Sequence, residues 1–200
     1  MEIVDINTFV DFHKEVEKYY QANYLFRGHQ DFSWQLVPKI GRKEFAKAVP
    51  AIFKEDLIIN SWSRYSNHLL QNKPVDEWDE LTLAQHHGLA TRLLDWTKNP
   101  LVALYFATYD FNERKDSAVF ILDFKNKTIN TKKAGPFHVK RSGVFYPKGI
   151  SARVINQRGV FTVSHEPQTS LEQLLKDYEF IKLRIKGEAK KAIQRNLEQN

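Results

Sequence analysis

Five side chains capable of binding or proton-transfer chemistry lie in one apolar segment, LAQHHGLATRLLDWTKNP, residues 83 to 100. They are His86, His87, Arg92, Asp95 and Trp96. Imidazole, guanidinium and carboxylate groups can hold a ligand or move protons. Because polar groups near a core need partners, the segment indicates either a ligand site or an internal hydrogen-bond network.

The two histidines do not suit a shared metal ion. Adjacent residues on a helix point about 100° apart, whereas helical zinc ligands are spaced i, i+4. We therefore predict no metal site here. One histidine either contacts a ligand or caps the helix end before Gly88.

The other three side chains each allow two interpretations. Arg92 and Asp95 can pair with each other across a turn, and Trp96 can lie in the core or stack on a flat ring of a ligand. Arg27 in the earlier stretch LFRG either grips a phosphate or carboxylate through two hydrogen bonds or forms an internal salt bridge, for instance with Asp95. Gly28 allows the tight turn that would bring Arg27 to a strand end.

Several common chemistries are excluded or disfavoured. The chain has no cysteine, so it has no disulfide, thiol nucleophile or cysteine-ligated metal. It contains no G-x-S-x-G elbow, no G-x-G-x-x-G and no G-x-x-x-x-G-K-[ST] loop. A serine hydrolase of the elbow type and the common nucleotide-binding folds are therefore not expected.

Positive charge is concentrated in residues 125 to 158, which contain nine Lys or Arg residues and no acidic residue. Such a surface attracts DNA, RNA or another polyanion, or it is simply a solvated face. The chain has no long apolar run and no basic start followed by an apolar stretch, so we expect a cytoplasmic protein without a membrane partner.

Periodicity and capping residues predict the elements that position these groups. We expect a first helix capped by Asn7 or Thr8, a strand at 24 to 28, and a helix at 44 to 70 interrupted near Pro50. A helix at 76 to 88, a strand at 90 to 96 and a helix capped by Thr97 follow. Later we expect strands at 118 to 124, 159 to 165 and 180 to 187, and helices at 169 to 178 and 188 to 200, with loops at 125 to 149. Helices first and strands later predict an α+β single domain with N-terminal helices packed on a mixed or antiparallel sheet.

Three motifs resemble the FRG domain family, which is named for its Phe or Tyr, Arg, Gly signature. They are LFRG, LAQHHGLATRLLDWTKNPLVALYFAT and ARVINQRGVFTV. The resemblance covers about residues 20 to 165, within a single FRG-like domain of residues 1 to 200. Residues 166 to 200 then form a helix-strand-helix extension.

A second resemblance is to ADP-ribosyltransferases of the arginine-serine-glutamate type. Arg27 and Gly28 match their Arg on a first strand, and Asp95, Trp96 and Thr97 stand where these enzymes have Ser-Thr-Ser. The helix patterned like VAxxFA follows directly, as it does in these enzymes. The resemblance implies an ADP-ribosyltransferase-like fold and NAD as substrate.

This resemblance also implies roles for individual residues. Arg27 would hold the pyrophosphate, Thr97 or His87 would support the nicotinamide ribose, Trp96 would stack, and Gln157 or a nearby acid would polarise the ribose. The catalytic set is Arg27, His87, Asp95 and Gln157. The residues expected around the cofactor are Arg27, Gly28, Gln85, His86, Thr91, Arg92, Trp96, Thr97 and Arg153.

The third motif departs from the enzyme pattern, because Gln157 or Asn156 stands near the position of the catalytic Glu. A neutral amide can donate a hydrogen bond but cannot offset the positive charge that develops on the sugar. Asp95 and Glu166 are the acids nearest to the motifs in sequence.

Three functions remain open. The first is an NAD-using enzyme that modifies nucleic acid in a toxin or phage-defence setting, with an antitoxin or regulatory partner. The second is a non-catalytic module that binds a nucleotide or nucleic acid. In the third, the motif is a buried polar network that fixes the fold.

Overall fold

The computed structural model describes residues 1–48, 55–66, 68, 73–110, 112, 114–147 and 159–199. The chain divides into two compact units, each of which we describe by itself. Unit 1 contains Met1–Trp34, Trp96–Asn126 and Lys176–Asn200, and unit 2 contains Gln35–Asp95 and Lys127–Leu175. Each unit combines helices with an open sheet, which confirms the predicted α+β class.

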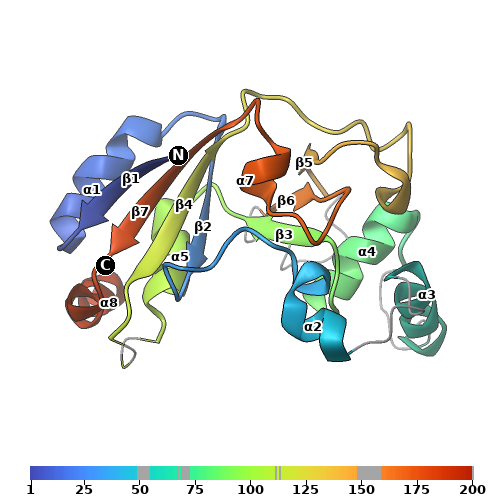
Figure 1. Cartoon of the computed structure of the whole chain (residues 1–200), viewed down its shortest axis with the longest axis horizontal. Coiled ribbons are helices and arrows are strands. Elements are labelled where there is room, and N and C mark those ends of the chain that lie inside the picture. The colour runs from blue at the N-terminus through green and yellow to red at the C-terminus, as the bar shows by residue number, and fades with distance from the viewer. Residues whose placement is uncertain are drawn as a thin grey trace. The chain divides into compact units, whose positions relative to one another are not determined.

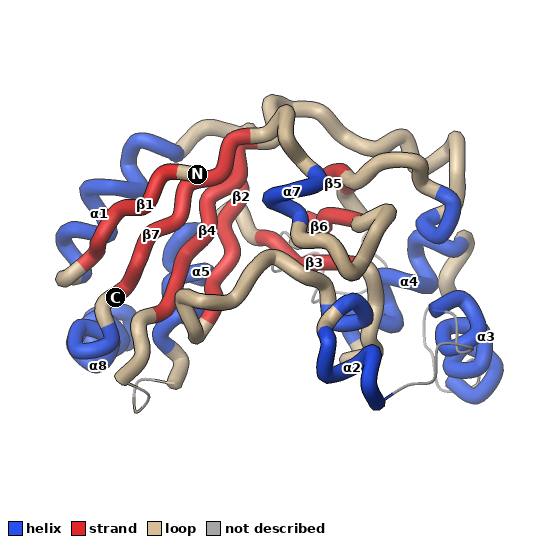
Figure 2. Tube along the Cα trace, in the orientation of Figure 1, coloured by secondary structure: helices blue, strands red, loops and turns tan. Residues whose placement is uncertain are grey.

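Unit 1 is built around a four-stranded mixed sheet with the strand order β1-β7-β4-β2. Strand β1 pairs with β7 in parallel, whereas β4 is antiparallel to both β7 and β2. Figure 2 shows these four strands side by side. The elements of the unit are β1 (Glu2–Ile6), α1 (Phe9–Val16), η1 (Glu17–Tyr19), β2 (Tyr24–His29), α5 (Pro100–Thr108), β4 (Ser117–Asp123), β7 (Glu179–Ile185), η4 (Gly187–Ala189) and α8 (Lys190–Gln199).

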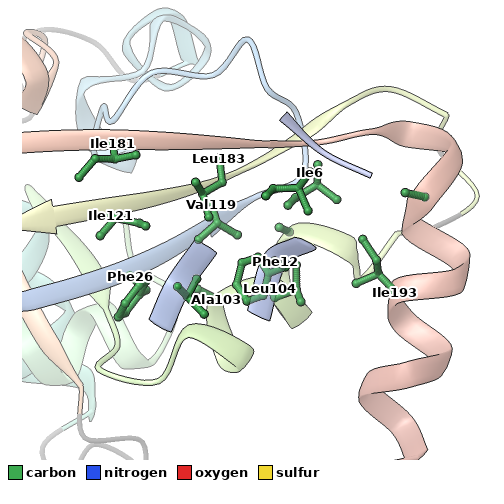
Figure 3. Packing of buried hydrophobic residues seen from close by; sticks show 14 residues of the cluster. Ile6, Phe12, Phe26, Ala103, Leu104, Val119, Ile121, Ile181, Leu183 and Ile193 are labelled. Carbon is green, nitrogen blue, oxygen red and sulfur yellow. The ribbon is translucent and has the colours of Figure 1, made fainter. Parts of the chain in front are cut away.

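Helices α1, α5 and α8 supply the apolar side chains that pack against one face of this sheet. Figure 3 shows Phe12 of α1, Leu104 of α5 and Ile193 of α8 in the same cluster as Val119 and Leu183 of the strands. Alternate residues of a strand point to opposite faces, so each strand contributes every second residue to this cluster. One face of the sheet is therefore covered by these helices.

Helix α5 approaches β2 unusually closely at Gly28. A Cβ atom at position 28 would lie 2.0 Å from the carbonyl oxygen of Ala103 and 2.7 Å from the backbone nitrogen of Ala107. Both contacts are to helix backbone, which cannot move aside as a flexible side chain can. Glycine at position 28 is thus required by packing, and the tight turn expected there from the sequence is wrong, because β2 continues to His29.

Unit 2 packs helices α3 and α4 against a three-stranded sheet with the order β3-β6-β5. Its core joins Ile59 of α3 and Trp78 and Leu81 of α4 to Phe145 and Phe161 of the strands. The unit contains η2 (Lys39–Gly41), α2 (Lys43–Ala48), α3 (Glu55–Ser66), α4 (Glu77–His86), η3 (Pro136–His138), β5 (Gly143–Phe145), β6 (Val160–Val163), α7 (Leu171–Leu174) and β3 (Leu93–Trp96), whose last residue belongs to unit 1 (Figure 1).

Most predicted elements are confirmed, with four differences. Thr8 caps α1 as expected, but Asn99 rather than Thr97 caps α5, because the Asn99 side chain accepts from the Leu101 N–H. Helix α7 ends at Leu174, well before residue 178, and its Ser170 cap makes no side-chain hydrogen bond. Strand β1 was not predicted, and β5 lies in a region predicted as loop. Pro50 lies outside the described residues.

The C-terminal segment predicted as an extension contributes strand β7, which pairs with β1 on one side and β4 on the other. It therefore supplies an inner strand of the unit 1 sheet. None of the described helices is long and apolar enough to span a bilayer.

We expect Gly28→Ala to lower the free energy of unfolding by about 3 kcal/mol or to prevent folding, because the helix backbone cannot move aside to remove the clash with the added methyl group. Urea unfolding followed by circular dichroism measures the change. Gly88→Ala is the matched control: Gly88 has φ +85° but no atom near its would-be Cβ, so only about 1 kcal/mol of backbone strain is expected. Equal costs at both positions would contradict the packing explanation.

Candidate functional site

Arg27 lies on the face of the unit 1 sheet opposite the helices. Phe26 and Gly28 point toward α5, so Arg27 between them points the other way. In register with it are Phe120 on β4 and Lys182 on β7, and directly opposed residues share a face. We call these three residues the Arg27 row.

The Arg27 guanidinium is held by a neighbour on its own strand. Its Nε donates to Nε2 of His29, at 3.0 Å, because residues two apart on a strand lie on the same face. At the other end of the row, Lys182 Nζ donates to the Phe32 carbonyl oxygen at 2.5 Å and lies 4.1 Å from the centre of the Phe32 ring. The face thus combines cationic side chains with aromatic rings.

Thr97 joins the edge of β2 beside this row. The Phe26 N–H donates to the Thr97 carbonyl at 2.8 Å, and the Thr97 N–H donates back to the Phe26 carbonyl at 2.9 Å. The Thr97 hydroxyl oxygen accepts from the Asn99 N–H at 3.1 Å, and Asn99 then caps α5. The sequence after β3 therefore runs from the edge of the Arg27 strand directly into the N-terminus of α5.

Trp96 is only 2% exposed and offers little ring surface to a ligand. The bridge between Thr97 and Phe26 is antiparallel, so Trp96 lies across from Arg27 on the adjoining chain. Of the two roles left open for this tryptophan, burial favours the core.

Three of the predicted polar residues in unit 2 form one hydrogen-bond chain. Asp95 accepts from Gln85 Nε2 at 3.1 Å, and the Thr91 hydroxyl donates to Gln85 Oε1. Thr91 in turn accepts from the Leu93 N–H at 3.1 Å and is fully buried. The chain ties the end of α4 to the start of β3, while the exposed Asp95 carboxylate is held in one orientation at its end.

Arg92 pairs with Glu55 of α3, and not with Asp95 as considered from the sequence. One Glu55 oxygen accepts from the Arg92 N–H at 2.6 Å and the other from Arg92 Nε at 2.6 Å. The guanidinium also lies 5.3 Å from the Phe137 ring centre. Burial raises the pKa of the Glu55 carboxyl, and the Arg92 charge and hydrogen bonds lower it again only in part. Arg92 is therefore occupied by a buried structural pair.

The two histidines end helix α4. His87 is its C-cap, with its N–H donating to the Leu83 carbonyl, and Gly88 follows with positive φ. The His87 ring is exposed and tilted against Trp62, with ring centres 5.7 Å apart. His86 contacts His87 edge to face. Both the predicted capping role and an accessible imidazole are present at this helix end.

Arg153, Asn156 and Gln157 lie outside the described residues. Glu166 is exposed and lies 3.5 Å from the His165 ring nitrogen. Within the described ranges, no group of three or more His, Asp or Glu side chains is arranged to hold a metal ion.

Sequence reasoning missed two residues that hold the predicted ones in place. His29 lies two positions after Arg27, and this same-face spacing was a usable signal. Glu55 has no local signal, because it is 37 residues from Arg92 and reaches it only through the packing of α3.

Comparison with known proteins identifies one family. The FRG domain model matches residues 22–116, which include LFRG and the long middle motif and end before ARVINQRGVFTV. No curated protein and no solved structure matches the chain. The FRG resemblance is confirmed over this segment, and the likeness to ADP-ribosyltransferases stays a prediction.

Removing either member of the Glu55 and Arg92 pair should lower the free energy of unfolding by about 3–5 kcal/mol, because the other charge is left buried without its partner. In a double-mutant cycle with Glu55→Ala and Arg92→Ala, the double variant should cost less than the sum, with a coupling of about 1–3 kcal/mol. Urea unfolding gives all three values. Lys18→Ala, which removes the exposed lysine of its pair with Glu15, is the control and should change stability by under about 1 kcal/mol. Additive effects of the two alanines would show that the pair is not coupled.

Proposed function

The chain carries an FRG domain over residues 22–116, and we propose that it binds NAD and transfers the ADP-ribose group to an acceptor. The observation that carries the proposal is the backbone pairing of Thr97 with Phe26. It brings together, within unit 1, the Arg-Gly strand and the strand-to-helix turn that the resemblance to ADP-ribosyltransferases requires. These two elements are about 70 residues apart in the sequence.

The charge of this region suits a pyrophosphate. Arg27 presents a planar cation that matches phosphate oxygens. Lys182 in the same cross-strand row adds positive charge from a buried ammonium group that donates to the Phe32 carbonyl. The N-terminus of α5, which carries the positive end of the helix dipole, begins three residues after Thr97. In the proposal Arg27 binds the pyrophosphate, and the Thr97 side chain of the same unit supports the nicotinamide ribose.

The reaction requires a group that offsets positive charge on the ribose. The bond between the ribose C1′ and nicotinamide breaks, nicotinamide leaves with the electron pair, and the acceptor forms a bond to C1′ and loses a proton. The acid that the sequence offers for this role is Asp95, which accepts a hydrogen bond from Gln85 and precedes Thr97 by two residues in the chain. Gln157, in the position where such enzymes have Glu, would contribute a neutral hydrogen bond.

Incubation with NAD, with and without DNA or RNA, tests this function by mass spectrometry for free nicotinamide and ADP-ribose adducts. Arg27→Ala should raise the NAD concentration needed for half-maximal thermal stabilisation by about 10- to 100-fold, as expected for loss of charged hydrogen bonds. Asp95→Asn should keep the stabilisation and lose nicotinamide release. Arg195→Ala, an exposed arginine of the same unit, is the control. Absence of both nicotinamide release and NAD-dependent stabilisation in the natural chain would exclude the proposal.

A second candidate is a non-catalytic module that binds nucleic acid. It is favoured by the exposed cations of the basic segment in unit 2, which carries no acidic residue between 127 and 147. The five exposed cations are Lys127, Lys132, Lys133, Lys140 and Arg141. Acidic Glu77 of α4 lies against Gly135 and weakens the positive potential at that point of the segment.

Binding of a labelled oligonucleotide at several salt concentrations tests this candidate. Affinity should fall with salt, and the Lys132→Ala, Lys133→Ala double variant should reduce the slope of log affinity against log salt by about 2. Lys191→Ala, an exposed lysine of unit 1, should leave the slope unchanged. Oligonucleotide binding without any nicotinamide release would favour this module over the enzyme, and salt-independent or absent binding would exclude it.

A further inference from the structure

We infer that His29 is a positioning residue that fixes the Arg27 guanidinium for its ligand. The inference rests on the proposed nucleotide site, and it adds a residue that neither the sequence motifs nor the family resemblance singled out. Its basis is the hydrogen bond from Arg27 Nε to His29 Nε2, at 3.0 Å.

The imidazole of His29 is itself held firmly. It is 5% exposed, and its ring makes edge contacts with Phe120 and Trp34, whose ring centres lie 5.1 Å and 6.0 Å away. A ring clamped between two aromatic residues keeps its Nε2 lone pair in one direction. The Nε end of Arg27 is therefore oriented by a group that cannot rotate freely.

The hydrogen bond also fixes the protonation of His29. Arginine can only donate, so Nε2 must accept and the ring proton must be on Nδ1. A neutral ring adds no positive charge beside Arg27 or to the face that carries the cationic Lys182 and Arg184 of β7, and its Nδ1 is buried. The acidic residues are Asp31 on the adjoining segment and Glu2 and Asp5 on β1, of which Asp5 pairs with Arg184.

The consequence for a ligand follows from the geometry of guanidinium. The group is planar, so fixing Nε and the adjoining side chain limits the directions in which the two Nη nitrogens donate. Because the Arg27 side chain is already ordered, it loses little conformational entropy when a pyrophosphate binds through these nitrogens. His29 acts through Arg27 and need not touch the ligand.

The first test needs no ligand. In ¹⁵N spectra the Arg27 Nε–H signal, assigned by its loss in Arg27→Lys, should exchange slowly with water in the natural chain and fast in His29→Phe. Phenylalanine keeps an aromatic ring between Phe120 and Trp34 but has no acceptor. His29→Gln, which offers an oxygen acceptor, should restore part of the protection.

The second test measures NAD. His29→Phe should raise the NAD concentration needed for half-maximal stabilisation by about 3- to 10-fold, as for loss of one hydrogen bond, and His29→Gln should recover part of this. For nicotinamide release, KM for NAD should rise while kcat stays within about twofold, a split that general loss of structure would not give. Thermal unfolding of each variant without NAD checks that it is folded.

The outcomes separate this inference from the proposed function. In one outcome the Arg27 Nε–H is protected only when residue 29 can accept a hydrogen bond, while neither the natural chain nor any variant responds to NAD. This result would confirm the positioning contact and exclude its proposed use in NAD binding. If the natural chain binds NAD and folded His29→Phe binds it equally well, the inference is overturned and the function stands. Fast Nε–H exchange in the natural chain also overturns the inference.

Discussion

The contact between helix α5 and strand β2 at Gly28 is the constraint on which the rest of unit 1 depends. With the helix backbone 2.0 Å from where a Cβ would be, Phe26 and Gly28 can only face the helix. Strand alternation then commits Arg27 and His29 to the opposite face. The same approach brings the residues before α5 to the edge of β2, where Thr97 pairs with Phe26. A single steric requirement thus determines which side chains are available to form a site.

The polar residues of the middle motif divide into two kinds. Gln85, Thr91 and Arg92 are used internally, in the chain that ends at Asp95 and in the buried pair with Glu55. This supports, for that part of the motif, the interpretation of a polar network that fixes the fold. Buried charge and hydroxyl groups need such partners, because leaving them without hydrogen bonds costs several kcal/mol. Asp95, at the end of the hydrogen-bond chain, and His87, the C-cap of α4, are exposed.

The elements were largely predictable, because each has a strong local signal. The alternating apolar strand at β4, the Thr8 cap and the Pro100 start of α5 all depend on residues close in sequence. The failures depend on distant partners. The short EIVDI stretch becomes a strand because β7, about 180 residues later, pairs with it. Arg92 was given the nearest acid as its partner, whereas packing supplies Glu55. Arg27 was correctly placed on a strand, but its contact with His29 requires knowing that both side chains share the face of the sheet opposite the helices.

The limits of the family match have a consequence for how the chain can be divided. The matched segment ends at residue 116, one residue before β4 begins. Among the described strands, only β4 pairs with β2 in the unit 1 sheet, and β7 is the next strand beyond it. A fragment cut to the matched residues would keep LFRG on a strand without its sheet partner, and α5 would keep its contact with β2 but lose its contacts with β4 and α8. The segment that matches the family model is therefore shorter than the stretch of chain that folds together. The geometry of the LFRG signature depends on residues outside that segment.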